Sequence, residues 1–160
     1  MHSALLLAAI AFQDPMPSPP PFIATDVESP QAITKALYNV ISGPAGQKRD
    51  WKRFKSLFAP KATLQALVKN RQGEFVLVTM TPDEYATRSG PLMEERGFFE
   101  KETSLDVTRW EGKNIVNVSS KYESRTKESD EKPFQTGMNL LQLYSDGKRW
   151  YVVSILWQGD

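Results

Sequence analysis

Residues 49–62 of the 160-residue chain read RDWKRFKSLFAPKA, and this stretch decides how the chain folds. Asp50 is a typical helix N-cap, because its carboxylate can accept a hydrogen bond from a free backbone N–H of the first turn. One face of the expected helix then carries four apolar side chains: Trp51, Phe54, Leu57 and Phe58. Pro60 is expected to end this helix, because proline cannot continue the backbone hydrogen-bond ladder. A β-rich segment follows.

A first helix is predicted upstream of this stretch. Ser29 suits the N-cap and Pro30 the first helical position, where a missing N–H costs nothing. Apolar residues then recur at helical spacing: Ile33, Ala36, Leu37, Val40 and Ile41. Gly43 and Pro44 end the helix.

Downstream, residues 63–69 and 75–80 read as a β-hairpin joined by Asn-Arg-Gln-Gly. Thr81 and Glu84 stand at the spacing of a capping box, which predicts a third helix. That helix is expected to be interrupted at residues 90–91, Gly-Pro, and to end at Gly97.

The rest of the chain is predicted to be β-structure. The expected strands are residues 99–110, 115–125, 134–144 and 149–157, with an exposed polar loop at 126–133. The element order is therefore α-α-β-β-α-β-β-β-β. This order predicts an α+β fold in which three helices cover one face of a strongly bent, mainly antiparallel sheet.

The order and two local motifs resemble the NTF2-like superfamily, also called SnoaL-like or cystatin-like. Residues 49–62 resemble its passage from second helix to first strand, and residues 146–153, DGKRWYVV, resemble its closing hairpin. The resemblance covers about residues 28–158. Three shorter stretches, 41–44, 122–125 and 157–158, resemble uncharacterised bacterial members described only as nuclear transport factor 2 family proteins. The resemblance implies a cone-shaped fold with a pocket between the helices and the concave sheet face.

The composition excludes several kinds of chemistry. The chain has no Cys, a single His at position 2 and a formal net charge of +1. Thiol nucleophiles, disulfides and Cys-based metal sites are therefore absent, and no carboxylate cluster has metal-ligand spacing, so we expect no metal and no cofactor. The superfamily's dehydratases and cyclases that resemble scytalone dehydratase use a His–Asp pair, which His2 cannot supply. Other members use Asp, Arg, Tyr and Asn, but no catalytic residue can be carried over to this sequence.

Five cations gather around the second helix: Lys48, Arg49, Lys52, Arg53 and Lys55. A nucleic-acid site is one interpretation. Because the net charge is near zero and the cations alternate with apolar residues, a solvated helix face is the favoured one, and we expect no nucleic-acid partner.

The N-terminal region divides into two further segments. Residues 1–11 resemble a signal peptide, truncated or complete, since the apolar run is too short to span a membrane. Residues 12–27 form a Pro-rich linker, and residues 28–160 form the domain. We therefore expect a periplasmic or secreted protein without a stable membrane anchor, and otherwise a cytoplasmic one.

Strand alternation selects candidate pocket residues. Tyr122, Asn139 and Trp157 fall on the apolar faces of their strands, and Tyr85 and Arg88 lie on the third helix near the expected mouth. Each has a plainer interpretation. The aromatic residues and the amide can be core groups with satisfied polar atoms, and Arg88 can simply pair with the carboxylate one turn before it.

These observations predict a module that binds a small apolar molecule, or an accessory module, without strong catalysis. The alternative is a SnoaL-like isomerase, lyase or hydrolase that acts on a small apolar substrate without His. A protein-interaction module is a third interpretation. A pocket of a few hundred Å³ with a buried carboxylate would favour the enzyme, and a cone filled by aromatic side chains would favour the interaction module. A homodimer through the outer sheet face is also expected.

Overall fold

The computed structural model describes residues 21–160. Three α-helices and six β-strands follow in the predicted order, after a short 3-10 helix at Ala24–Asp26. The helices are α1 (Pro30–Ile41), α2 (Trp51–Ser56) and α3 (Pro82–Arg96). The strands are β1 (Phe58–Lys69), β2 (Phe75–Met80), β3 (Phe99–Arg109), β4 (Ile115–Arg125), β5 (Gln135–Ser145) and β6 (Trp150–Gly159).

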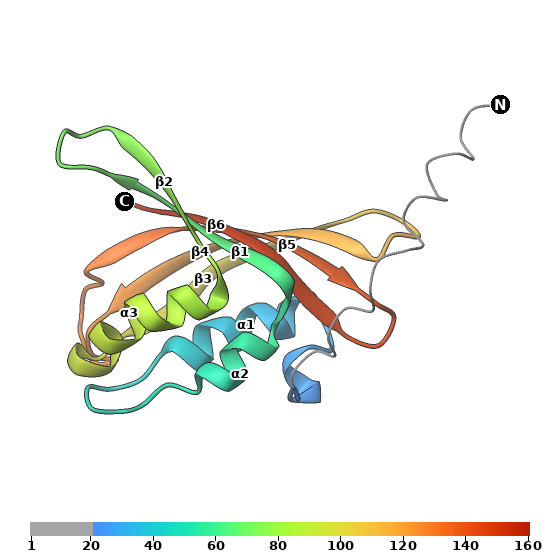
Figure 1. Ribbon diagram of the computed structural model, residues 1–160, viewed down its shortest axis with the longest axis horizontal. Helices are drawn as coiled ribbons and strands as arrows, with labels where there is room; N and C mark the ends of the chain where they lie inside the picture. Colours follow the sequence, from blue (N-terminus) through green and yellow to red (C-terminus); the bar gives the residue numbers. More distant parts are fainter. Residues whose placement is uncertain (1–20) are drawn as a thin grey trace.

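All six strands belong to one curved, open sheet with the order β2-β1-β6-β5-β4-β3. Neighbouring strands are antiparallel except β1 and β6, which are parallel. The three helices lie on one side of this sheet, and the β1–β2 hairpin projects beyond the helical layer (Figure 1). The predicted α+β architecture is confirmed. In this architecture the helices pack against the concave face of the sheet.

The helix starts follow the predicted chemistry. Ser29 Oγ accepts from the backbone N–H of Ala32 at 3.0 Å, and Asp50 Oδ1 accepts from that of Arg53 at 2.8 Å. At α3 the capping box is complete, because Thr81 and Glu84 each accept a backbone hydrogen bond from the other. Each cap satisfies a donor that the first turn cannot satisfy within the helix.

Two proline predictions are wrong. Helix α2 ends at Ser56, and Pro60 lies inside β1, where the pairing with β6 is irregular between Phe58 and Thr63. A bulge of this kind tolerates a residue without an N–H. Helix α3 also continues through Pro91 instead of breaking there. Gly90 packs against the indole of Trp51, where an added Cβ would lie 2.9 Å from Cζ2.

Strand β6 departs from strict alternation. Strict alternation places Val153 inward with Tyr151 and Ile155, but the register with β5 shifts between Gln142 and Leu143. As a result Val152 is fully buried, whereas Val153 is 39% exposed. The bulge inserts one extra residue into β6, so the residues that precede it point to the opposite face from the one that strict alternation predicts.

The domain begins before residue 28. Val27 is 1% exposed and belongs to the core, and Asp26 is buried beside Arg53. The last residues of the predicted linker 12–27 therefore pack on the domain. The predicted signal peptide, residues 1–11, and most of that linker lie outside the described residues, so the export prediction stays a prediction. Among residues 21–160, no helix is long and apolar enough to cross a membrane.

Candidate functional site

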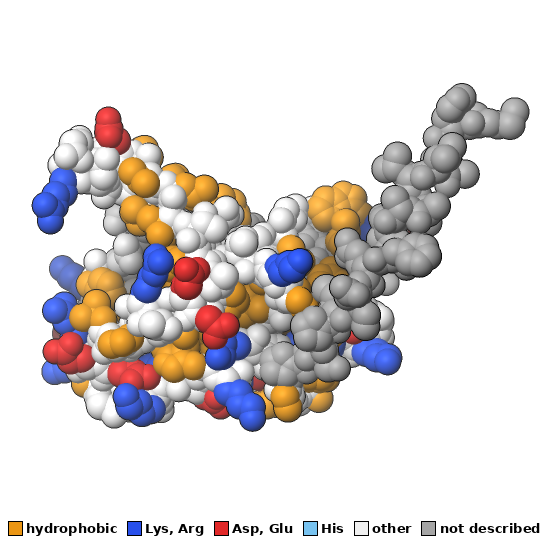
Figure 2. Space-filling view, viewed as in Figure 1, with side chains coloured by type: hydrophobic (Ala, Val, Ile, Leu, Met, Phe, Trp, Pro, Cys, Tyr) orange, Lys and Arg blue, Asp and Glu red, His pale blue; other side chains and the backbone are white. Residues whose placement is uncertain are grey.

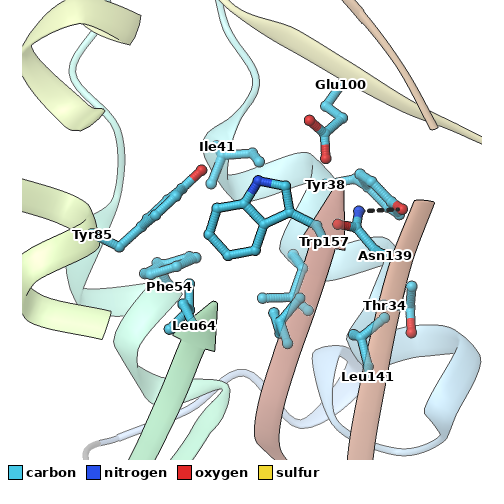
Figure 3. A pocket seen from close by; sticks show the side chains of 12 residues that line it. Thr34, Tyr38, Ile41, Phe54, Leu64, Tyr85, Glu100, Asn139, Leu141 and Trp157 are labelled. Carbon is cyan, nitrogen blue, oxygen red and sulfur yellow. Dashed lines mark hydrogen bonds between the residues drawn. The ribbon is translucent and has the colours of Figure 1, made fainter. Parts of the chain in front are cut away.

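A cavity of about 70 Å³ lies between the helices and the concave face of the sheet. Figure 3 shows its lining side chains converging from α1, α2, α3 and four strands. They are Thr34, Leu37, Tyr38, Ile41, Phe54, Leu64, Tyr85, Glu100, Asn139, Leu141, Ile155 and Trp157. Most of this wall is apolar, and its polar groups gather where α1 faces the start of β3.

The carboxyl group of Glu100 is the one acidic group in this wall. Glu100 is the second residue of β3 and stands opposite Ser124 of β4 in the register. Ser124, which is fully buried, donates from its Oγ to Oε2 of Glu100 at 3.1 Å. The backbone of Glu100 is also fixed, because its N–H donates to Oγ of Ser42 at the end of α1.

Burial raises the pKa of Glu100 from 4.5 to about 7. The hydrogen bonds from Ser124 and Asn139 lower the pKa, but the loss of hydration outweighs them. The carboxyl group therefore changes between its neutral and charged forms close to neutral pH. A group poised in this way can accept or donate a proton without a large energetic cost.

A second polar group stands beside Glu100 and joins three elements. The hydroxyl of Tyr38 on α1 lies 2.7 Å from Oγ of Ser120 on β4, and it accepts from Nδ2 of Asn139 on β5 at 3.0 Å. Burial raises the pKa of Tyr38 to about 12, so the phenol keeps its proton at neutral pH.

Aromatic rings form the opposite side of the cavity. The ring of Tyr85 is stacked on Phe54 at 5.4 Å between centroids and meets the edge of Trp157 at 6.1 Å. The indole of Trp157 stands at the centre of the lining residues (Figure 3). This indole takes up part of the space between the helices and the sheet.

The structure brings three of the five candidate residues to this cavity. Tyr85, Asn139 and Trp157 line it. Tyr122 is buried next to it on the inner face of β4, with its hydroxyl against Gly137, where an added Cβ would lie 2.5 Å from Oη. Arg88 points outward, and its guanidinium lies 3.6 Å from the carboxylate of Glu84. Arg88 therefore pairs with the carboxylate one turn before it and does not line the cavity.

Sequence reasoning missed Glu100 and Tyr38. Residues 99–102, Phe-Glu-Lys-Glu, read as a charged, solvated strand end, and only the pairing of Glu100 with inward-facing Ser124 shows otherwise. The helical spacing could have pointed to Tyr38, because it follows Thr34 by four residues and so lies on the same side of the helix.

A wider groove meets the cavity at its polar end. It measures about 840 Å³ and runs between α1 and strands β3 and β4. Glu100 and Tyr38 line both the groove and the cavity. The Glu100 carboxyl therefore lies at the boundary between an apolar interior and a charged, solvent-filled surface, from which it can exchange protons.

The basic cluster is not a uniform solvated face. Arg49 is 6% exposed, and its guanidinium donates to the backbone carbonyls of Ile41, Gln47, Gly43 and Met93. Arg53 forms a bidentate pair with Asp26 at 2.7 and 2.9 Å. The solvated interpretation is therefore wrong for Arg49, which holds the end of α1, the following loop and α3 together. Within residues 21–160, no group of His, Asp or Glu is arranged to hold a metal ion.

Comparison with known proteins identifies the fold. No protein-family model matches the sequence, and no curated protein matches it. Among solved structures, a cystatin-like protein of unknown function from Nostoc punctiforme is similar at 11% identity and a TM-score of 0.60, covering 81% of this chain and 87% of that one. A candidate dehydratase of the NTF2-like family from Streptomyces avermitilis is similar at 13% identity and 0.59, covering 85% and 96%.

A candidate scytalone dehydratase from Novosphingobium aromaticivorans is similar at 10% identity and a TM-score of 0.57, covering 81% of this chain and 80% of that one. At these identities the likeness concerns the fold. The chain has the NTF2-like, cystatin-like fold, as the sequence predicted.

Proposed function

We propose that this NTF2-like protein binds a small, largely apolar molecule between its helices and its sheet, through a polar group that meets Glu100. The observation that carries the proposal is the Glu100 carboxyl at the end of an otherwise apolar cavity, next to the Tyr38 hydroxyl. Burying a carboxyl group costs free energy, and groups buried at such cost gather at functional sites.

The size of the cavity limits the ligand. About 70 Å³ accepts a few water molecules or the end of a molecule, whereas whole drug-sized ligands need roughly 300–1,000 Å³. The ligand is therefore a small compound, or a longer one that inserts only its end. Rotation of the Trp157 indole, which is only half-buried, would enlarge the space.

The polar end of the cavity favours a hydroxyl or carbonyl group on the ligand. A charged Glu100 accepts a hydrogen bond from a hydroxyl, and a neutral Glu100 donates one to a carbonyl oxygen. Because the pKa of Glu100 is about 7, both forms are accessible near neutral pH. An anionic end group is disfavoured, because it would meet a carboxylate in an apolar surrounding.

A second candidate function is acid–base catalysis by Glu100, as in an isomerase or a lyase. A pKa near 7 favours this role, because proton transfer is most efficient when the catalytic pKa is close to the working pH. Two of the similar structures bear the names of candidate dehydratases, which supports the same class. An enzyme would be favoured by a pocket of a few hundred Å³, whereas this cavity measures about 70 Å³, so binding stands first.

We also propose a homodimer through the outer face of the sheet. The outward residues in the middle of β1, β6 and β5 are uncharged, and Leu140 and Leu156 stand opposite one another there. They are 47% and 38% exposed. This face is uncharged and mixes the two leucines with polar residues such as Gln142 and Ser154, a composition that an interface between subunits can have.

Native mass spectrometry of the protein purified from its own host tests the binding proposal. We expect a retained small molecule that Glu100→Gln loses and Glu102→Gln keeps, since Glu102 lies two residues along the same strand but outside the cavity. Phenol and cyclohexanol provide a second test, because they should shift the NMR signal of the Trp157 indole N–H in the wild type. The proposal fails if the purified protein carries nothing and neither probe shifts that signal.

The catalytic candidate has a separate readout. Cyclohexanone in D₂O exchanges its α-protons when a base removes one and solvent returns a deuteron. If Glu100 acts as a base, the wild type accelerates this exchange above buffer, with a rate that rises through pH 7, and Glu100→Gln does not. Binding of cyclohexanone without faster exchange would leave the binding function and exclude this catalytic role toward ketones.

A further inference from the structure

The indole N–H of Trp157 is a hydrogen-bond donor in the wall of the cavity. Among the side-chain hydrogen bonds of residues 21–160, none involves this N–H, whereas the indole N–H of Trp51 donates to Glu94 at 3.1 Å. The nitrogen is also not sealed within the protein, because in the described part of the chain only Nη1 of Arg149 is a fully buried side-chain nitrogen or oxygen without a partner. The Trp157 N–H is therefore available to a molecule in the cavity.

The carboxyl group of Glu100 faces the same space. In Figure 3 this carboxyl group points toward the indole of Trp157, and the indole nitrogen lies on the side of the ring that is turned toward Glu100. Burial raises the pKa of the neighbouring Tyr85, and the negative charge of Glu100 raises it further, which agrees with this proximity. Ser124 and Asn139 already donate to Glu100, but a carboxylate accepts about four hydrogen bonds, so acceptor positions remain for a ligand.

These two groups require different hydrogen-bonding partners. An indole N–H only donates, and a charged carboxylate only accepts. A hydroxyl group accepts with its oxygen and donates its proton, so it can satisfy both groups at once. A carbonyl group only accepts and an ammonium group only donates, so each would leave one of the two protein groups unpaired inside the cavity.

The surface of the molecule favours an uncharged ligand. On the face seen in Figure 2, the Lys and Arg side chains are interspersed with the Asp and Glu side chains, and neither sign forms a patch of its own. The formal net charge of the chain is only +1. Such a surface has no strong field of one sign that would steer an ion toward the cavity.

We propose that Trp157 and Glu100 together recognise the hydroxyl group of an uncharged alcohol, whose oxygen accepts from Nε1 of Trp157 and whose proton is donated to the carboxylate of Glu100. The hydrocarbon part of the alcohol then lies against the apolar side chains that complete the wall. This inference rests on the proposed function and names the group that the ligand presents at the same site. It makes Trp157 a specificity-determining residue.

Cyclohexanol and cyclohexanone test the inference, because they share one ring and differ in whether the oxygen carries a proton. Their affinities are measured by ligand-detected NMR titration at about pH 8, where Glu100 is mostly charged. We expect cyclohexanol to bind about tenfold more tightly, since the ketone leaves the charged carboxylate without a donor. Glu100→Gln should lower the affinity for cyclohexanol to about that for cyclohexanone. Glu102→Gln, on the same strand but outside the cavity, should keep the preference.

The NMR signals of the indole N–H groups report on the second contact. Cyclohexanol should move the signal of Trp157 downfield, and the signal of Trp51 should stay in place because its N–H already donates to Glu94. Trp157→Phe keeps an aromatic ring without the donor and should weaken cyclohexanol binding about five- to tenfold. Tyr85→Phe removes the neighbouring hydroxyl but keeps the indole, so it should preserve the preference for the alcohol.

Three results would overturn the inference and leave the proposed function standing, as long as cyclohexanol binds in a Glu100-dependent way. The first is a wild type that binds cyclohexanone or the cyclohexylammonium ion at least as tightly as cyclohexanol. The second is a Trp157 signal that does not move downfield when cyclohexanol binds. The third is loss of the preference in Tyr85→Phe, which would make Tyr85 the donor. If neither cyclohexanol nor cyclohexanone binds, the proposed function fails together with the inference.

Discussion

The hydroxyl of Tyr38 lies 2.7 Å from Oγ of Ser120, and this contact joins the middle of α1 to the middle of β4. Ser120 is fully buried, and the third member of the group, Asn139, stands opposite it on β5. The helix is therefore held to the sheet at one polar point inside an apolar interface. Such a group fixes the position of the helix, because sliding by one turn would leave the buried hydroxyls of Tyr38 and Ser120 and the half-buried amide of Asn139 without these partners.

Replacing Tyr38 by Phe tests this point. The change leaves the Ser120 hydroxyl and the Asn139 amide without their partner, so the free energy of unfolding should fall by about 1–3 kcal/mol. Urea denaturation measures the loss. The double variant Tyr38→Phe, Ser120→Ala should recover part of it, because the second change removes one of the unpaired groups. A fully additive loss would contradict the coupling.

The Glu100 carboxyl should make stability depend on pH. The fold raises its pKa from 4.5 to about 7, so the folded state keeps its proton to higher pH than the unfolded chain does. The free energy of unfolding should therefore fall as pH rises from about 4.5 through 7, by at most on the order of 3 kcal/mol. In Glu100→Gln this fall should disappear, as measured by urea denaturation across the range.

The same pH series contains its own control. Hydrogen bonds from Lys48 and from the backbone of Arg49 lower the pKa of Glu94 to about 2. The contribution of Glu94 to the free energy of unfolding is therefore complete above pH 4.5 and is lost as the pH falls from 4.5 to about 2. This range lies below the pH range of 4.5 to 7 in which Glu100 has its effect. If Glu100→Gln alters only the region below pH 4, the raised pKa of Glu100 is wrong.

The buried guanidinium of Arg49 should be essential to the fold. Arg49→Lys keeps the charge, but an ammonium group cannot reach the separate carbonyls of Ile41, Gly43 and Met93. We expect a loss of about 2–4 kcal/mol by thermal and urea denaturation. Lys48→Ala is the control, because its side chain is 89% exposed, and it should cost less than 1 kcal/mol.

Gly90 offers a case in which helix propensity and packing oppose each other. Glycine to alanine in a helix normally stabilises by up to about 1 kcal/mol. Here the added Cβ would lie 2.9–3.2 Å from three atoms of the Trp51 indole, and overpacking of this kind costs about 1–3 kcal/mol. Gly90→Ala should therefore lower the melting temperature. An increase would show that the indole moves aside.

The proposed dimer interface is tested by one charge on the outer sheet face. Leu140→Glu should convert the dimer to a monomer in sedimentation experiments, because a carboxylate would be buried against the apolar face of the second copy. Leu92→Glu on α3, at a residue that is 50% exposed, should leave the dimer intact. A wild-type protein that sediments as a monomer would exclude the interface.

Much of the fold can be predicted from residues that lie close together in the sequence. The caps at Ser29, Asp50 and Thr81 each lie within one helical turn of the groups that they satisfy. Simple alternation predicts the inward face of β4. The same alternation in β5 and β6 predicts that Asn139 and Trp157 face the cavity, and both line it. These features depend on residues only a few positions apart, so the pattern of apolar and polar residues along the chain is enough to predict them.

The features that sequence analysis missed depend on residues far apart in the chain. Pro60 lies in a strand because a bulge against β6 receives it, and Val153 faces outward because β6 slips by one residue against β5. Arg49 is buried because carbonyls from the end of α1, the following loop and α3 converge on it, and Met93 of α3 lies 44 residues away in the chain. Each outcome is set by partners that local spacing does not identify.

The sequence by itself determined the number and order of the helices and strands along the chain, and it leaves residues 21–160 without His or Cys. Only the tertiary structure decided which polar groups share the interior. Glu100 stands in a charged run of residues, and it becomes a half-buried group with a pKa of about 7 only because β3 pairs with β4 and α1 lies across both. Burial and pKa depend on the whole surrounding of a side chain, and that surrounding exists only once the chain has folded.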